Sequence, residues 1–147
     1  MGSVDTSSPE FKALQQAIAV ASKQQSAERI IKTNLLSLRF QMETYLETAQ
    51  IEKIEIGTFL KKFMDALQIK NKDFAKYIGY KESNLSALFS GKRKINGDLA
   101  LKLGSIFKID AALWIHIQTK NELMKIKAAN EEKYAKYQLE DLLKKAA

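Results

Sequence analysis

The chain of 147 residues contains no cysteine and a single histidine, His116. Without cysteine the protein has neither a disulfide framework nor a thiolate zinc site, and one histidine alone does not make a metal site. Apolar runs such as Ala111 to Ile117 are far shorter than the roughly 20 residues of a membrane-spanning helix. Nothing at the N-terminus resembles a secretion signal. We therefore expect a cytoplasmic protein with no metal, cofactor or membrane partner.

The elements of an enzyme are also missing from the sequence. It has no glycine-rich phosphate loop, no nucleophile with a plausible base beside it, and no cluster of metal ligands. We expect no catalytic residue, and a function in binding instead.

Positive charge is concentrated in the middle of the chain. The formal net charge is +7, and Lys70 to Lys102 contains eight Lys or Arg against three Asp or Glu, which is +5 of that excess. A basic excess confined to one short helical region is typical of a protein that binds a polyanion such as nucleic acid. The alternative is a surface that only keeps the protein soluble.

The sequence has only one proline and six glycines, so long stretches are free to form helices. Residues 1–11 resemble a vector-derived or disordered segment, although Ser8 and Pro9 also form a plausible helix start. Residues 12–53 are predicted to be a helical extension with an apolar seam. This candidate dimerisation seam consists of Ile31, Leu35, Leu38, Met42 and Tyr45, continuing to Ala49. It either joins two chains or packs on the body of its own domain.

Residues 54–118 are predicted to form one compact domain of five helices. Thr58 is expected to cap the first, after a break at Ile54 to Gly57. The others are predicted at about 71–78, 82–89, 99–107 and from 111 onward, with Asn96 or Asp98 and then Asp110 as caps. Trp114 and Phe107 are expected in the core. Residues 119–147 are predicted to be a charged C-terminal helical tail.

The second and third of these helices fit a helix-turn-helix. Such a unit needs a small residue where the helices cross, a glycine at the turn and buried apolar residues, and Ala75, Gly79 and Leu85 meet these needs. Phe74, Ile78 and Leu88 would complete the inner face. A rotation of about 100° per residue then places short polar side chains on the outer face, which is the surface that suits a major groove. The residues of this outer face are Glu82, Ser83, Ser86, Ala87 and Ser90.

Residues 56–118 resemble the HigA-type antitoxins of the lambda-repressor-like, XRE-family helix-turn-helix proteins. The resemblance is carried by five stretches of the sequence: Ile56-Gly57 with Phe59-Leu60, Phe74-Ala75 with Ile78-Gly79, Leu85 to Arg93, Ile95 to Leu103, and Leu113 to Ile115 with Gln118. It implies an all-α fold with a lambda-repressor-like DNA-binding domain, and a homodimeric repressor of a palindromic operator in double-stranded DNA. It also implies an antitoxin that neutralises a toxin protein. Lys70 and Lys81 depart from the family, which often has a serine cap at both positions.

The resemblance also implies roles for individual residues. The base-reading candidates are Lys81, Glu82, Ser83, Ser86 and Ser90, and the phosphate-binding candidates are Asn71, Lys72, Lys92, Arg93 and Lys94. Glu82 either accepts a hydrogen bond from a cytosine or only favours a helix N-terminus electrostatically. The alternative for the second group is a solvated basic loop. The alternative for the whole chain is a helical module that binds a toxin or another partner, with DNA binding secondary.

Overall fold

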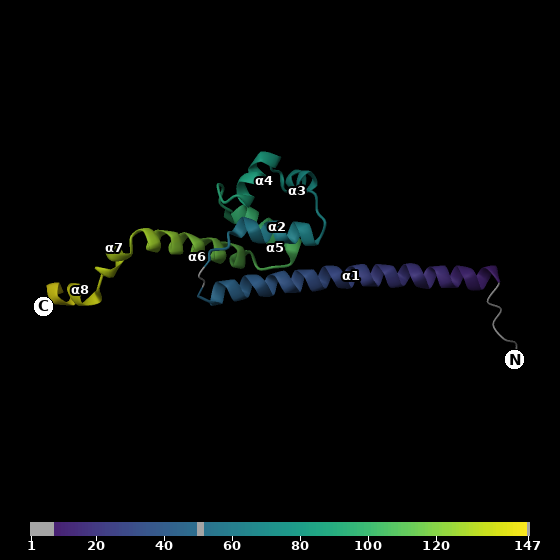
Figure 1. Cartoon of the computed structure of the whole chain (residues 1–147), viewed down its shortest axis with the longest axis horizontal. Helices are drawn as coiled ribbons and strands as arrows, with labels where there is room; N and C mark the ends of the chain where they lie inside the picture. Colours follow the sequence, from purple (N-terminus) through teal and green to yellow (C-terminus); the bar gives the residue numbers. More distant parts are fainter. Residues whose placement is uncertain (1–7, 50–51, 147) are drawn as a thin grey trace.

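The computed structural model describes residues 8–49 and 52–146, and this part of the chain is all-α, as the sequence predicts. In Figure 1, α1 is a long rod beneath a compact group made by α2 to α5, and α6 to α8 lead away from that group at the end opposite the N-terminus. The helices are α1 (Pro9–Glu47), α2 (Ile56–Ala66), α3 (Asn71–Ile78), α4 (Glu82–Phe89), α5 (Gly97–Phe107), α6 (Ala111–Ala129), α7 (Glu131–Ala135) and α8 (Leu139–Ala146).

The N-terminal extension is one helix of 39 residues. At 1.5 Å per residue its length is about 58 Å. The hydroxyl of Ser8 accepts a hydrogen bond from the N–H of Phe11 at 3.1 Å, and Pro9 is the first helical residue, which confirms the predicted helix start. Of the predicted segment 1–11, residues 1–7 lie outside the described residues, and Pro9 to Phe11 belong to α1.

The predicted seam divides into a buried part and an exposed part. Leu38, Met42 and Tyr45 are buried in the core of their own domain, and Leu35 is half-buried against it. Ile31 is exposed. For the three buried residues the structure therefore corrects the proposed dimer contact, because their apolar surface is already covered by the α2 and α6 side of the same chain.

An aromatic cluster fills the centre of the domain. The ring of Phe63 lies 4.8 Å from that of Phe107 and 5.5 Å from that of Trp114, measured between centroids. Trp114 and Phe107 are fully buried, which confirms their predicted place in the core. Phe74 packs 6.0 Å from Phe107 and joins α3 to the same cluster. Such tilted contacts are favourable arrangements of aromatic rings.

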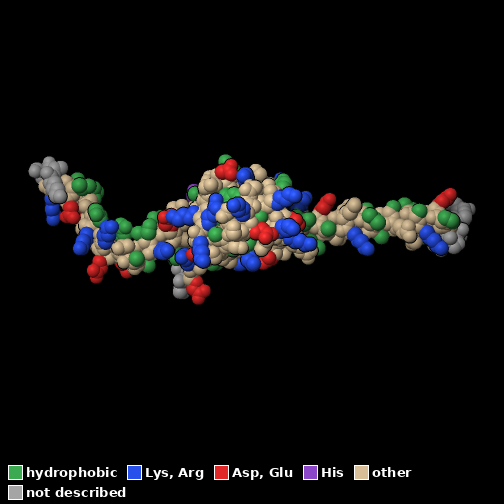
Figure 2. Space-filling model, turned by 90° about the horizontal axis from the view of Figure 1, so that it is seen from above, with side chains coloured by type: hydrophobic (Ala, Val, Ile, Leu, Met, Phe, Trp, Pro, Cys, Tyr) green, Lys and Arg blue, Asp and Glu red, His purple; other side chains and the backbone are tan. Residues whose placement is uncertain are grey.

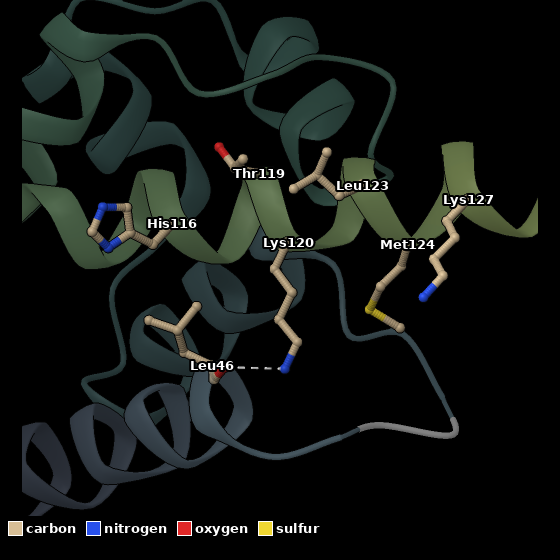
Figure 3. A pocket seen from close by; sticks show the side chains of 7 residues that line it. All are labelled: Leu46, His116, Thr119, Lys120, Leu123, Met124 and Lys127. Carbon is tan, nitrogen blue, oxygen red and sulfur yellow. Dashed lines mark hydrogen bonds between the residues drawn. The ribbon is translucent and has the colours of Figure 1, made fainter. Parts of the chain in front are cut away.

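Polar side chains of α6 hold the C-terminal end of α1. Figure 3 shows the ammonium group of Lys120 pointing to the carbonyl of Leu46, and the same group donates to the carbonyls of Tyr45 and Thr48, the last at 2.7 Å. The last carbonyls of a helix lack an intrahelical donor, and a cation near this end also interacts favourably with the helix dipole. Asn121 is buried beside them, where its amide donates to the Ile54 carbonyl at 2.7 Å.

One predicted helix start is wrong, and the predicted domain boundary at 118 falls inside a helix. The helix predicted from 111 onward continues as α6 to Ala129, and Asn121 beyond that boundary is still buried, so the predicted tail 119–147 comprises the end of α6, then α7 and α8. Thr58 does not cap α2, because the helix already starts at Ile56 and the cap position is Glu55, without a side-chain hydrogen bond. Asn96 and Asp110 do cap α5 and α6, as predicted.

Candidate nucleic-acid interface

The two motif helices, α3 and α4, meet at a tight turn. Gly79 has a φ of 79° and a ψ of 29°, the left-handed conformation that glycine adopts without strain. The N–H of Tyr80 donates to the carbonyl of Ala75 at 2.8 Å and satisfies one of the free carbonyls at the end of α3. Both helices begin where the sequence predicts, after Lys70 and Lys81, and neither of these lysines makes a side-chain capping hydrogen bond.

The inner face of this unit is buried as predicted. Phe74, Ala75 and Ile78 of α3 and Leu85 and Leu88 of α4 are at most 3% exposed. Burial of these side chains fixes the rotation of α4 about its own axis, because its apolar residues recur at helical spacing. The opposite side of α4 must then face solvent.

A glycine that the sequence analysis interpreted as a helix break instead lets α2 pack against α4. A Cβ atom added to Gly57 would lie 1.9 Å from the carbonyl oxygen of Leu88 and 2.8 Å from the Cα of Phe89. Gly57 is therefore inside α2, and its lack of a side chain permits the close approach. The sequence offered only one sign of this, since Gly57 precedes an apolar stripe of helical spacing, from Phe59 to Met64.

All five base-reading candidates are exposed on α4 and its two cap positions. They occupy the start, the outer side and the end of α4, with Lys81 at the N-cap and Ser90 at the C-cap position. The hydroxyl of Ser90 donates to the carbonyl of Ala87 at 3.2 Å and keeps its oxygen free to accept from elsewhere. The exposed candidates are Lys81, Glu82, Ser83, Ser86 and Ser90. These residues form the outer face of α4.

The phosphate-binding candidates lie at the start of α3 and in the loop that follows α4. Asn71 and Lys72 are the exposed first residues of α3, and the exposed segment Lys92 to Lys94 follows α4. The Arg93 guanidinium lies over the ring of Tyr80 at 4.9 Å, and the backbone N–H of Arg93 donates to the carbonyl of Ala87 at 3.0 Å. These contacts tie the basic loop to α4 and to the turn before it, an arrangement that local sequence spacing does not reveal.

Lys94 differs from its neighbours because a carboxylate pairs with its charge. Its ammonium group lies 2.8 Å from a carboxylate oxygen of Glu122 on α6. Glu122 is 28 residues away in the sequence, so only the packing of α6 brings the pair together.

Seen from above, toward α3 and α4, Lys and Arg side chains gather over the central body and are sparser along the N-terminal rod of α1 (Figure 2). This agrees with the basic excess between Lys70 and Lys102. Along the chain, the exposed outer face of α4 thus lies between Lys72 and the basic segment Lys92 to Lys94.

Comparison with known proteins identifies this arrangement. Residues 60–114 match the family model HTH_3, described as helix-turn-helix. The matched segment includes α3, α4 and α5, so this part of the chain is similar to helix-turn-helix domains. Among curated proteins, no relative matches the chain.

Three solved structures share the fold of the helix-turn-helix domain and its surroundings. A candidate antidote protein of a plasmid maintenance system from Nostoc punctiforme is 26% identical, with a TM-score of 0.53 over 58% of this chain and 93% of its own. The Pseudomonas aeruginosa antitoxin HigA, solved with the higBA promoter, is 22% identical, with a TM-score of 0.55 over 60% and 98%. A further Pseudomonas aeruginosa protein, solved with its operator DNA, is 23% identical, with a TM-score of 0.54 over 58% and 92%. The predicted lambda-repressor-like fold is confirmed.

Beyond the helix-turn-helix domain, the described residues contain no group of three His, Cys, Asp or Glu that is placed to hold a metal ion. His116 is exposed and lines a shallow apolar pocket on α6 with Leu123 and Met124 (Figure 3). No helix in the described part of the chain is long and apolar enough to cross a membrane.

Proposed function

We propose that this protein is a sequence-specific DNA-binding transcriptional repressor that acts in the cytoplasm and is not an enzyme. The observation that carries the proposal is the outer face of α4, which exposes short polar side chains and is followed by the exposed basic segment Lys92 to Lys94. Two proteins of the same fold were solved with promoter or operator DNA, which supports the same kind of ligand here.

In this proposal α4 lies in the major groove, which is about 12 Å wide and displays a distinct pattern of donors and acceptors for each base pair. The Glu82 carboxylate accepts from a cytosine amino group, while Ser83 and Ser86 donate or accept according to the base. Lys81 and Ser90 contact the edges of the site. Because these side chains are short, the backbone of α4 can approach the bases closely.

Residues at the start of α3 and after the end of α4 hold the DNA backbone. Asn71 and Lys72 at the start of α3 present their side chains and backbone N–H groups to the phosphates of one DNA strand. Lys92 and Arg93 approach the backbone at the other end, and Lys94 joins them when it leaves Glu122. Such contacts set the register of the protein without reading sequence.

Selection of bound duplexes from a random pool tests this function. We expect a preferred site with two-fold symmetry and half-sites about 10 base pairs, or a multiple of this, apart, since a dimer presents two copies of α4. Titrations of the selected and a scrambled duplex then give the specificity ratio. Equal affinity for the two duplexes would overturn the repressor assignment.

We also propose that the protein regulates its own gene as the antitoxin of a toxin-antitoxin pair. One structural neighbour is an antitoxin and another is a candidate antidote protein, which supports this function. The N-terminal part of α1 offers the protein-binding surface, because Leu14, Ile18 and Ile30 are each more than half exposed there. Co-expression with the gene beside it tests this role, and we expect a small partner protein to co-purify. If the protein binds the partner but no DNA, the helical interaction module is the better description.

A further inference from the structure

A pocket of about 390 Å³ lies beside the exit of α4. Its walls are the segment that leads into α2, the loop after α4, and the outer half of α6. Four basic residues line it, and all four lie outside α4: Lys53, Arg93, Lys94 and Lys125. Arg93 and Lys94 already belong to the phosphate-binding candidates, so this pocket adjoins the proposed DNA surface.

Two carboxylates occupy the same pocket and neutralise half of its positive charge. Glu55 lies 2.8 Å from the ammonium group of Lys53, and Glu122 lies 2.8 Å from that of Lys94. Glu55 is also next to Gly91, since a Cβ atom added to this glycine would lie 3.3 Å from its carboxyl carbon. Each carboxylate thus lies beside the exit of α4 and holds a lysine.

We propose that this pocket binds a phosphate of the DNA backbone, and that Glu55 and Glu122 weaken DNA binding by holding Lys53 and Lys94 in the free protein. This inference rests on the proposed DNA-binding function. The four cations of the pocket attract a backbone phosphate. The two carboxylates repel it and compete with it for two of the lysines. Ion pairs as exposed as these are weak, so DNA can break them, at a cost that lowers its affinity.

Glu122→Gln and Glu55→Gln test the inference because each frees one lysine with almost no change in side-chain size. We expect each variant to bind duplex DNA about two- to fivefold more tightly at low salt, which corresponds to the strength of an exposed ion pair. The dependence of affinity on salt should steepen by about one unit of slope for each lysine that gains a phosphate. The preference among sequences should stay the same.

Glu43→Gln is the matched control, because it removes the same charge from an exposed ion pair with Arg39 on α1, at 2.8 Å. An equal gain in this control would show a general effect of net charge and overturn the inference. Unchanged affinity in both pocket variants would overturn it as well. Lys125→Gln tests the pocket independently. Loss of this cation should weaken the binding of duplex DNA and flatten the dependence of affinity on salt.

The result separates the two proposals. If the parent protein discriminates the selected duplex from a scrambled one, but the pocket variants behave like the control, the pocket inference fails and the repressor function stands. If the parent protein shows no sequence preference, the repressor function fails, while the affinities of the pocket variants for any duplex still decide whether the pocket binds phosphate. Circular dichroism spectra and melting temperatures show that every variant is folded.

Discussion

At the scale of single residues, two glycines support the helix-turn-helix domain for different reasons. Gly57 is needed for space. Replacement by alanine would place a methyl group 1.9 Å from the backbone oxygen of Leu88, so α2 and α4 must move apart. We expect Gly57→Ala to lower the free energy of unfolding by at least about 1 to 3 kcal/mol, as overpacking does. Thermal unfolding measures this loss.

Gly97→Ala is the control for this prediction, because Gly97 opens a helix and no atom lies within 4 Å of its added Cβ. We expect its stability to remain close to that of the parent protein. If Gly57→Ala also melts like the parent, α2 and α4 are not packed as closely as the structure shows.

Gly79 is needed for its backbone conformation instead, since nothing lies within 4 Å of a Cβ added there and its φ is 79°. A left-handed conformation costs a residue with a side chain about 1 to 2 kcal/mol. We therefore expect Gly79→Val to destabilise the protein clearly and Gly79→Asn to do so less, because asparagine tolerates this region better. Equal melting temperatures for the two variants would contradict this account of the turn.

At the scale of elements, substitutions in α4 and in the loop after it are expected to impair DNA binding in different ways. Replacing Lys92 and Arg93 with alanine should weaken binding to every duplex and flatten the salt dependence by about one unit of slope per contact. Replacing Glu82, Ser83 or Ser86 should leave the slope nearly intact and relax the preference at particular base pairs by about 1 to 3 kcal/mol.

Titrations of preferred and scrambled duplexes at several salt concentrations separate the two effects. Tyr77 on α3 is exposed and lies outside both groups of candidates, so Tyr77→Phe serves as a control that should change neither quantity. If discrimination survives the loss of all three α4 residues, α4 is not the element that reads the sequence.

One cation, the ammonium group of Lys120, links α6 to the C-terminal end of α1. Lys120 donates to carbonyls of Tyr45, Leu46 and Thr48, and hydrogen bonds from charged donors are stronger than neutral ones. We expect Lys120→Met, which keeps the length of the side chain, to lower the free energy of unfolding by about 1 to 3 kcal/mol. Lys127→Met on the same helix removes the same charge from an exposed position and should cost little. Chemical denaturation of the two variants makes the comparison, and equal stabilities would show that the junction does not need the cation.

At the scale of the whole molecule, the exposed part of α1 decides how two chains can meet. The proposed dimer can no longer depend on Leu38, because this residue is 6% exposed and belongs to the domain core. Leu38→Glu should therefore unfold the domain whatever its oligomeric state. Leu14 and Ile18, both 57% exposed, remain available on the same helix.

We expect light scattering to give the mass of a dimer at tens of micromolar protein, and Leu14→Glu with Ile18→Glu to reduce it to that of a monomer. Charges in an apolar helix seam are strongly disfavoured, which is the reason for the loss. Gln16→Glu with Ala27→Glu adds the same charges on the opposite side of α1 and should leave the dimer intact. A parent protein that is monomeric with and without operator DNA would contradict the dimer, and a dimer that survives the first pair of changes would place its interface elsewhere.

The sequence by itself determined the helices of the DNA-binding domain, because these depend on local features. The apolar spacing of Phe74, Ile78, Leu85 and Leu88 and the turn at Gly79 define α3 and α4 wherever the rest of the chain lies. The same spacing predicted the exposure of the outer face of α4. The helix caps at Ser8, Asn96 and Asp110 were also predictable, because each depends on a side chain and a backbone N–H only a few residues apart.

Only the tertiary structure decided which surfaces meet. The apolar seam of α1 fits a second chain as well as it fits its own domain. The hydrogen bonds that Lys120 donates to the end of α1, and the one that Asn121 accepts from the Tyr45 hydroxyl, select packing on its own domain for Leu38 and its buried neighbours. Gly57 looks like a helix break until α4 is packed on it. The pairing of Lys94 with Glu122 likewise joins residues far apart in sequence. Such contacts depend on how helices pack, and the order of residues along one helix does not encode that.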